Sequence, residues 1–268
     1  MLPFPRLKAG TMEIAFDCTQ CGRCCHNLRL TLSVAEARVW AARGHQVDLL
    51  AEGWPWPDAE IHPDDAVAQW RLATSFPVTV GDVPFRVNLR LVARHDGACP
   101  HLLPDMRCGN YEARPRICGI YPLESRPFEA MEPARRLCPP EAWDAGLPVL
   151  ERDGVPADAG AAAIVEAHRA AMIADVAVKE RLVRAIGWAE MAMAGEGLAV
   201  REIAPDALVA ALDAVERGCV VEALPWSIVT NRETTRAILA ELECPARLVV
   251  AGDGFLAAFG DHPSTGSG

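Results

Sequence analysis

A run of nine residues near the start of the chain concentrates side chains able to do chemistry. It reads CTQCGRCCH, from Cys18 to His26, and holds four thiols and one imidazole. Two residues separate Cys18 from Cys21 and Cys21 from Cys24, a spacing by which one short loop wraps a zinc ion or an iron–sulfur cluster. We predict that this loop binds metal. Since neighbouring residues of extended backbone point to opposite sides, Cys24 and Cys25 should serve different functions or different metals.

A second group of cysteines follows further along the chain, comprising Cys99, Cys108, Cys118 and Cys138. Eight thiols suit two four-thiolate sites, or one cluster with spare ligands. His26 and His101 each neighbour a predicted ligand and are weaker candidates for coordination, the alternative being simple exposure. Cys219 and Cys244 stand apart from both groups, and we expect them to be ordinary small buried residues.

The spacing of the cysteines does not identify which metal they bind. C-x2-C-x2-C matches the part of a ferredoxin loop that holds a 4Fe-4S cluster, although the ferredoxin's fourth cysteine is missing here. The late segment has no pair of closely spaced cysteines of the kind that structural zinc sites use. This absence makes zinc the less favoured metal. The preferred cofactor is a 4Fe-4S cluster on Cys18, Cys21, Cys24 and one late cysteine. Zinc and mononuclear iron are the alternatives.

Arginines and tyrosines accompany the cysteines. The arginines that could offset the negative charge of a metal–thiolate site are Arg23, Arg107, Arg114 and Arg116. Arg114 precedes a proline just before Cys118 and would also suit an anionic substrate, so Arg114 and Tyr111 are the candidate catalytic residues; a turn-stabilising role for Arg114 is the alternative. Tyr111 and Tyr121 flank Cys118, where they would shield the metal, donate hydrogen bonds to its sulfurs, or simply pack.

Two separated motifs of this chain resemble one known family. The first is the C-x2-C-x2-C-C loop, and the second is the run CGNYEARPRIC from Cys108 to Cys118. Together they closely resemble the YkgJ-type cysteine-cluster family, described as zinc- or iron-chelating proteins of the CxxCxxCC type. The resemblance covers roughly residues 14–140 and implies a metal-binding protein. Members often carry arginine after the third late cysteine, where this chain has Gly119, so no arginine role is carried over to that position.

Short elements must position these motifs. Alternation predicts a strand over 28–32, and Ser33 with Glu36 predicts a capping box that opens a helix ending at Gly44. Residues 51–65 are rich in Pro, Trp, Asp and Glu and indicate a loop. A hairpin follows, with strands over 78–80 and 85–91. The prolines between Cys99 and Cys138 exclude long helices from that segment.

The composition changes after about residue 150, where alanine-rich sequence shows helical spacing. It predicts helices within 159–194, from Pro205 to Gly218 and from about 231 to 242, with a short strand at 248–250. The expected class is α+β: an irregular Cys-rich metal-binding domain with a β-hairpin and short helices, then a mostly α-helical C-terminal region. The expected domains are 1–150, 151–262 and a flexible tail, 263–268.

Bulk properties limit the function. The chain of 268 residues carries a net charge of −10, which argues against a nucleic-acid partner. It shows no signal peptide and no apolar run long enough for a membrane span, so we expect a cytoplasmic protein without a membrane partner. Clustered cysteines in that reducing compartment favour metal binding over disulfides.

We expect electron transfer or metal-dependent redox chemistry, with a redox or protein partner that the sequence does not identify. One alternative is a protein-modifying enzyme similar to flagellin lysine N-methylases, which carry a similar cysteine cluster; no S-adenosylmethionine-binding glycine loop is visible. The other alternative is a structural zinc module that presents the later half of the chain for binding.

Overall fold

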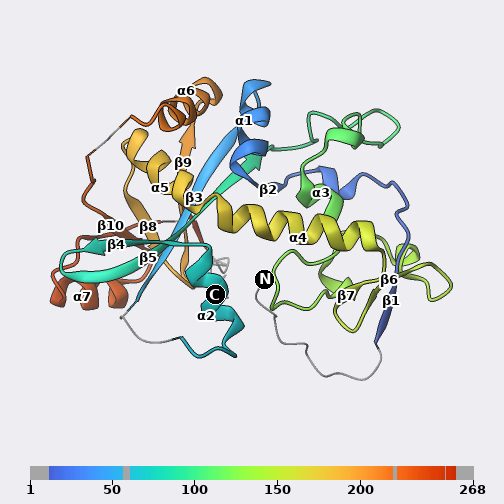
Figure 1. Cartoon of the computed structure of the whole chain (residues 1–268), viewed down its shortest axis with the longest axis horizontal. Coiled ribbons are helices and arrows are strands. Elements are labelled where there is room, and N and C mark those ends of the chain that lie inside the picture. Colours follow the sequence, from blue (N-terminus) through green and yellow to red (C-terminus); the bar gives the residue numbers. More distant parts are fainter. Residues whose placement is uncertain (1–11, 57–60, 220–221, 251, 258–268) are drawn as a thin grey trace, which may run out of the picture. The chain divides into compact units, whose positions relative to one another are not determined.

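The structure is a computed structural model that describes residues 12–56, 61–219, 222–250 and 252–257. They group into two compact units (Figure 1). Unit 1 comprises residues 12–46, 61–73 and 92–175, and unit 2 comprises the described residues within 47–56, 74–91 and 176–257. Helices and strands of both units confirm the α+β class. The domain boundary near residue 150 is drawn from composition and stays a prediction, and the predicted tail lies outside the described residues.

Unit 1 contains a small antiparallel sheet in which β6 (Val149–Arg152) pairs with both β1 (Glu13–Ala15) and β7 (Val155–Pro156). The longest helix of Figure 1, α4 (Ala159–Ala174), lies beside the short α3 (Arg116–Ile120). Ile120 and Val165 join the two helices in a small buried core with Leu123. This core fixes the helix that carries Cys118.

The capping box predicted at Ser33 is confirmed. β2 (Arg29–Leu32) leads into α1 (Val34–Ala42), where the Glu36 backbone N–H donates to the Ser33 hydroxyl and the Glu36 carboxylate accepts from the Ser33 backbone N–H at 2.9 Å. Unit 1 also includes α2 (Ala66–Ala73).

The cysteine-rich part of unit 1 is irregular, as its prolines predict. Between β5 (Val83–Arg94) and β6 its regular structure consists of α3 and the 3-10 turns Tyr111–Ala113, Pro133–Arg135 and Pro140–Trp143. This segment has few of the backbone hydrogen bonds that a sheet or a long helix provides. Its structure therefore depends more on side-chain contacts.

Unit 2 is built on parallel strands. β3 (Val47–Pro55), β8 (Glu190–Met193), β10 (Ser227–Thr230) and β11 (Ala246–Leu248) run in parallel and are hydrogen-bonded in that order. Four further strands pair antiparallel. β9 (Gly197–Ile203) pairs with β3, β12 (Phe255–Ala257) pairs with β9, and β4 (Phe76–Val80) pairs with β5 in the predicted hairpin.

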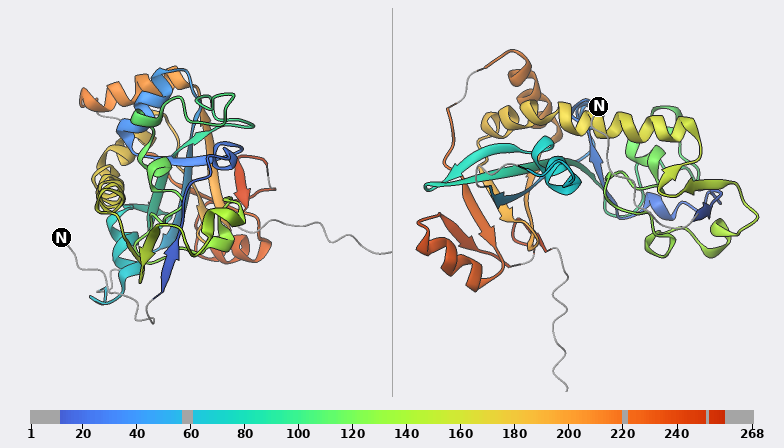
Figure 2. Two further views of the ribbon diagram at one scale, coloured as in Figure 1. Left: turned by 90° about the vertical axis from the view of Figure 1, so that its right-hand side faces the viewer. Right: turned by 60° about the horizontal axis from the view of Figure 1, so that its bottom comes forward.

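Helices of unit 2 follow the sequence pattern closely. α5 (Val176–Ala185) and α6 (Pro205–Glu216) lie in segments predicted to be helical, and α6 begins at the proline that predicted its start. α7 (Glu233–Glu241) lies beside β10 and β11, as both views of Figure 2 show. No helix among the described residues is long and apolar enough to cross a membrane.

Two parts of unit 2 differ from the sequence expectation. Residues 51–55, predicted to be loop, belong to β3, whose first five residues are all buried. In sequence, a buried parallel strand usually shows a continuous apolar run. In β3 the Trp and Pro at the end of the strand obscure this pattern. The alanine-rich region predicted as helix through residue 194 ends in β8, where Met191 and Ala192 are buried in the sheet.

Candidate metal centre

The first cysteine loop is folded by a glycine. Gly22 has φ of 68°, in the left-handed region that side chains with a Cβ rarely adopt, and its carbonyl accepts the Cys25 backbone N–H at 2.9 Å. A 3-10 turn, Arg23–Cys25, follows at once. The turn places two consecutive cysteines at the end of the loop.

Backbone hydrogen bonds bring the late cysteines to this loop. The Cys99 backbone N–H donates to the Cys25 carbonyl at 2.7 Å, and the Asn27 backbone N–H donates to the Gly97 carbonyl at 2.8 Å. The Asn27 side chain also accepts the Gly97 N–H at 2.6 Å. These contacts lie within unit 1, which contains all eight clustered cysteines.

One set of thiols combines Cys18, Cys21 and Cys24 with Cys138. Burial raises the pKa of Cys24 to about 12, and the charges of Cys25, Cys138 and Cys18 add to the effect. Burial also raises the pKa of Cys138, with further contributions from the charges of Cys21 and Cys18. We call these four residues the first set. The late cysteine left open by the sequence is therefore Cys138 in this grouping.

A second set combines Cys25 with Cys99, Cys108 and Cys118. Burial raises the pKa of Cys118 to about 12, and the charges of Cys99, Cys25 and Cys108 raise it further. The pKa of Cys99 is raised by burial and by the charges of Cys25 and Cys108. Cys25 adjoins the first set, because its side chain is hydrogen-bonded to that of Cys24 and the charges of Cys18 and Cys21 raise its pKa. The expectation that Cys24 and Cys25 point to opposite sides is wrong, since both lie in a 3-10 turn and not in extended backbone.

Neither set is a closed ligand shell. In the parts of the chain that the structure describes, no three Cys, His, Asp or Glu side chains are arranged so that they could hold a metal ion. All ten cysteines lie in these parts and are free thiols. The two sets are groups of neighbouring thiols, and the assignment of ligands stays a prediction.

Tyr121 is the polar side chain that contacts the first set. Its hydroxyl oxygen accepts the Leu137 backbone N–H at 2.6 Å and is hydrogen-bonded to the Cys138 side chain, which lowers the pKa of that thiol against the effect of burial. Arg136 lies with its guanidinium carbon 6.0 Å from the Tyr121 ring and pairs with Glu124 at 3.1 Å. The sequence drew attention to Tyr121 but gave no sign of Arg136 and Glu124.

Arg114 accompanies the second set. Its positive charge acts against burial and the neighbouring thiols to lower the pKa of Cys118. The Arg114 guanidinium carbon lies 3.9 Å from the centre of the Tyr111 ring, a cation–π contact, and Tyr111 is 58% exposed. The two candidate catalytic residues are thus in contact with each other, beside the second set.

The histidines lie close to the cysteines without joining either set. His26 Nδ1 lies 2.9 Å from the Gly22 carbonyl. The His101 ring packs 5.3 Å from both Trp40 and His45, and burial lowers its pKa. Its backbone N–H, however, is hydrogen-bonded to the Cys99 sulfur and lowers the pKa of that thiol.

The remaining predicted residues have other roles. Arg116 donates to Glu36 through its backbone N–H at 2.8 Å and its guanidinium at 3.2 Å, and Arg107 donates to the Gln20 side chain at 3.0 Å. Cys244 is buried, with its sulfur 3.2 Å from the Val80 carbonyl. Cys219 is exposed, so the expectation that it is buried is wrong; it lies just after the end of α6.

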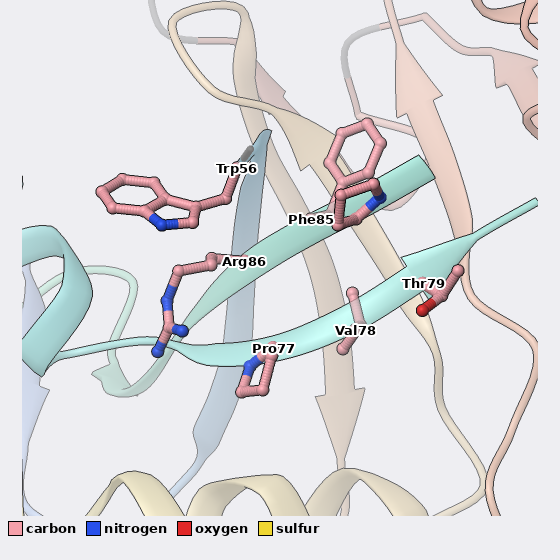
Figure 3. Close-up of a pocket in the computed structure, with 7 residues that line it drawn as sticks. Trp56, Pro77, Val78, Thr79, Phe85 and Arg86 are labelled. Carbon is pink, nitrogen blue, oxygen red and sulfur yellow. The ribbon is translucent and has the colours of Figure 1, made fainter. Parts of the chain in front are cut away.

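The described residues of unit 2 hold Cys219 and Cys244 and no group of thiols like those of unit 1. A hollow of unit 2 is lined by Trp56, Pro77, Val78, Thr79, Pro84, Phe85 and Arg86 (Figure 3). The Arg86 guanidinium donates a hydrogen bond to the Ser75 hydroxyl at 2.8 Å. The thiols of unit 1 are therefore the better candidate site.

Comparison with known families agrees with this location. Residues 17–139 match the family model "CxxCxxCC: Putative zinc- or iron-chelating domain". We call these residues the CxxCxxCC domain, after the family model that they match. The match begins one residue before Cys18 and ends one residue after Cys138, so the CxxCxxCC domain spans both thiol sets and little beyond them. None of the curated proteins or solved structures compared with the chain matches it.

The donor chemistry of the CxxCxxCC domain fits a bound cation. Neighbouring thiols that raise one another's pKa lose their protons only at a cost in free energy. A cation bound between the thiolates offsets that free energy. The hydrogen bonds to the Cys99 and Cys138 sulfurs are of the kind that orient and tune thiolate ligands. Zinc or iron chelation is the function that the match to this family model supports.

Proposed function

We propose that the CxxCxxCC domain binds metal at both thiol sets and serves in electron transfer. The first set would hold a 4Fe-4S cluster, and the second set would hold a second metal centre. The observation that carries this proposal is the division of eight thiols into two sets of four that adjoin at Cys24 and Cys25. Each set would supply the four thiolates that a 4Fe-4S cluster or a structural zinc ion uses.

Three features favour iron–sulfur chemistry at the first set. Three of its cysteines keep the ferredoxin spacing, and Cys138 supplies the fourth thiol from a distant part of the chain. Tyr121 is hydrogen-bonded to the Cys138 sulfur, a contact that tunes the potential of a cluster. A bound cluster would supply one-electron chemistry, with the four cysteines of the first set as its ligands and Tyr121 orienting Cys138.

Metal analysis of anaerobically purified protein tests the proposal. We expect brown protein with broad absorption near 400 nm and about four iron and four sulfide per cluster. Colourless protein with stoichiometric zinc would contradict the iron–sulfur assignment, while leaving metal binding by the CxxCxxCC domain intact.

Single cysteine variants test the division into sets. Cys138→Ser should remove the iron held by the first set, and Cys108→Ser should remove the metal of the second set. Cys244→Ser is the matched control, because Cys244 lies in unit 2 and should leave the metal content unchanged. If Cys138→Ser and Cys108→Ser removed the same metal, the grouping would be wrong.

A further inference from the structure

The strand β11 forms one edge of the parallel sheet of unit 2. Among the described strands it is the last in the order β3, β8, β10, β11, and it pairs with β10 alone. A strand at an edge exposes backbone N–H and C=O groups that another strand can use for pairing. Natural proteins usually protect such an edge with charged side chains, a proline or a covering segment.

The hydrogen bonds to β10 determine which backbone groups of β11 point out of the sheet. Pro245 and Val249 flank β11; the first accepts a hydrogen bond from β10 and the second donates one to it, both at 2.9 Å. Alternate residues of a strand direct their backbone groups to opposite sides. Ala246 and Leu248 therefore direct their N–H and C=O groups away from β10, and Val250 directs its N–H the same way.

Exposed apolar side chains gather at this edge. α7 lies beside β11 (Figure 2), and its Ile238 and the cap residue Leu242 are 59% and 50% exposed. Leu248 in β11 and Val250 just after it are 46% and 73% exposed. These four are all the large apolar side chains that the structure describes as exposed in unit 2. Such a group marks a contact surface.

α7 and the side chain of Leu248 lie on the same face of the sheet. Thr230 of β10 lies opposite Leu248 in the parallel register, so the two side chains point the same way. The hydroxyls of Thr230 and of Thr235 in α7 both donate to the Glu196 carboxylate. α7 therefore covers the face on which Leu248 lies, and the exposed side chains of both elements belong to one surface.

The charged residue of β11 does not protect the edge. Arg247 points to the opposite face from its neighbour Leu248, and its guanidinium pairs with Glu190 of β8 at 3.1 Å. This ion pair holds the positive charge over β10 and toward the middle of the sheet. The outer side of β11 is left with apolar side chains and backbone groups available for pairing.

We propose that a second copy of this chain occupies this edge, with the two β11 strands antiparallel about a two-fold axis at Leu248. In this register Leu248 lies opposite its counterpart and Ala246 lies opposite Val250 of the second copy, so the outward N–H and C=O groups meet. Arg247 lies opposite Val249, so no like charges face each other. The strand thus complements itself in hydrogen bonds and in side chains, and the symmetric contact closes at two copies.

Sedimentation equilibrium of the full chain tests this proposal. Reductant keeps the exposed cysteines from linking copies. The average mass should then rise from 28.9 kDa toward twice that value over about 1 to 100 µM, the range in which small interfaces dissociate. The rise should be the same with and without a chelator, because β11 lies in unit 2. A constant mass of 28.9 kDa, or a dimer that the chelator abolishes, would overturn the proposal.

A charge introduced at the centre of the contact locates it. Leu248→Lys places two like charges opposite each other and should raise the dissociation constant at least about tenfold. Ile173→Lys is the matched control, because it makes the same change at a 42% exposed site of unit 1 and should leave the dissociation constant unchanged. Equal effects of the two substitutions would overturn β11 as the contact.

Two double variants test the register. Ala246→Glu with Val250→Lys places opposite charges across the two-fold axis twice and should retain the dimer. Ala246→Lys with Val250→Lys places like charges there and should dissociate it, although the change reduces the net charge of −10 on each copy. The same behaviour of both double variants would overturn antiparallel pairing centred on Leu248.

Discussion

At the scale of single residues, the hydroxyl of Tyr121 is the contact most open to a clean test. It joins Leu137 and Cys138, and so holds the thiol that the first set takes from the end of the CxxCxxCC domain. Tyr121→Phe keeps the ring and removes the hydrogen bonds. We expect metal to be lost to a chelator about tenfold faster, the lower end of the range for residues that orient ligands.

Tyr111→Phe is the matched control for that substitution. The phenyl ring retains the cation–π contact with Arg114, and the Tyr111 ring is mostly exposed. Its rate of metal loss should stay within about twofold of the unsubstituted protein, since such a contact is worth about 0.5–1 kcal/mol at an exposed site. Equal acceleration in both variants would show that the Tyr121 hydroxyl has no special role.

The raised pKa values of Cys24 and Cys118 predict how pH acts on metal-free protein. Each thiol has a pKa of about 12 in the folded chain, against an ordinary value near 9.0. The unfolded chain therefore releases protons at lower pH than the folded chain, so the contribution to stability is complete below about pH 9 and is lost as pH rises toward about 12. Denaturation midpoints measured with chelator and reductant should fall between pH 8 and pH 11, and a constant midpoint would contradict the raised values.

Residue types and spacing predicted much of the site at this scale. The first loop and the late cysteines follow from local sequence. The separate orientation expected of Cys24 and Cys25 does not hold, because their side chains are hydrogen-bonded to each other in a 3-10 turn. The grouping of Cys138 with the first loop does not follow from local sequence, because 19 residues without a periodic pattern separate it from Cys118. Tertiary contacts such as the hydrogen bond between Leu137 and Tyr121 bring that thiol into place.

At the scale of elements, Glu36 links two helices that border the metal site. Its carboxylate accepts hydrogen bonds from Ser33 in α1 and from Arg116 at the start of α3. Burial alone would raise the pKa of Glu36, but these donors and the Arg116 charge hold it below its ordinary value. α3 carries Cys118, so the capping box of one helix also positions a predicted ligand on another.

Glu36→Ala should therefore affect both stability and metal binding. We expect a loss of about 1–3 kcal/mol, since it removes a cap and leaves buried donors without an acceptor. The second set should also bind its metal more weakly. Glu241→Ala is the control, because Glu241 is exposed at the end of α7 in unit 2. Urea unfolding and a competitive chelator titration measure the two effects.

Elements with a strong local signal were predicted well. The capping box, the hairpin and α6 depend on neighbouring residues, and the sequence shows them directly. β3 was missed because its burial comes from strands far away in sequence, while its own end carries Trp and Pro. β8 was missed because four residues are too few to show a period within alanine-rich sequence.

At the scale of the whole molecule, metal and folding should be coupled in unit 1 alone. The segment between β5 and β6 has little regular backbone hydrogen bonding, and all eight clustered cysteines lie in unit 1. Unit 2 has its own paired strands and a buried core that includes Met191 and Ile228. Removal of metal should therefore loosen the cysteine-rich segment and leave the strands of unit 2 folded.

Hydrogen exchange with and without a chelator measures this difference. Amides between residues 99 and 143 should exchange at least about tenfold faster after metal removal, while those of β9 and β10 keep their protection. Uniform loss of protection across both units would show that they unfold together. No change in either unit would show that metal does not stabilise the fold.

Cys24 and Cys25 are consecutive residues that belong to different thiol sets. Consecutive Cα atoms are about 3.8 Å apart and a metal lies about 2.3 Å from its sulfur, so two ions bound there can be no more than about 14 Å apart. At such a separation, unpaired spins on the two ions broaden each other's magnetic resonance spectra. Cobalt(II) placed in both sets would thus measure their spacing, and a residue inserted between Cys24 and Cys25 would change the spectra of both sites at once.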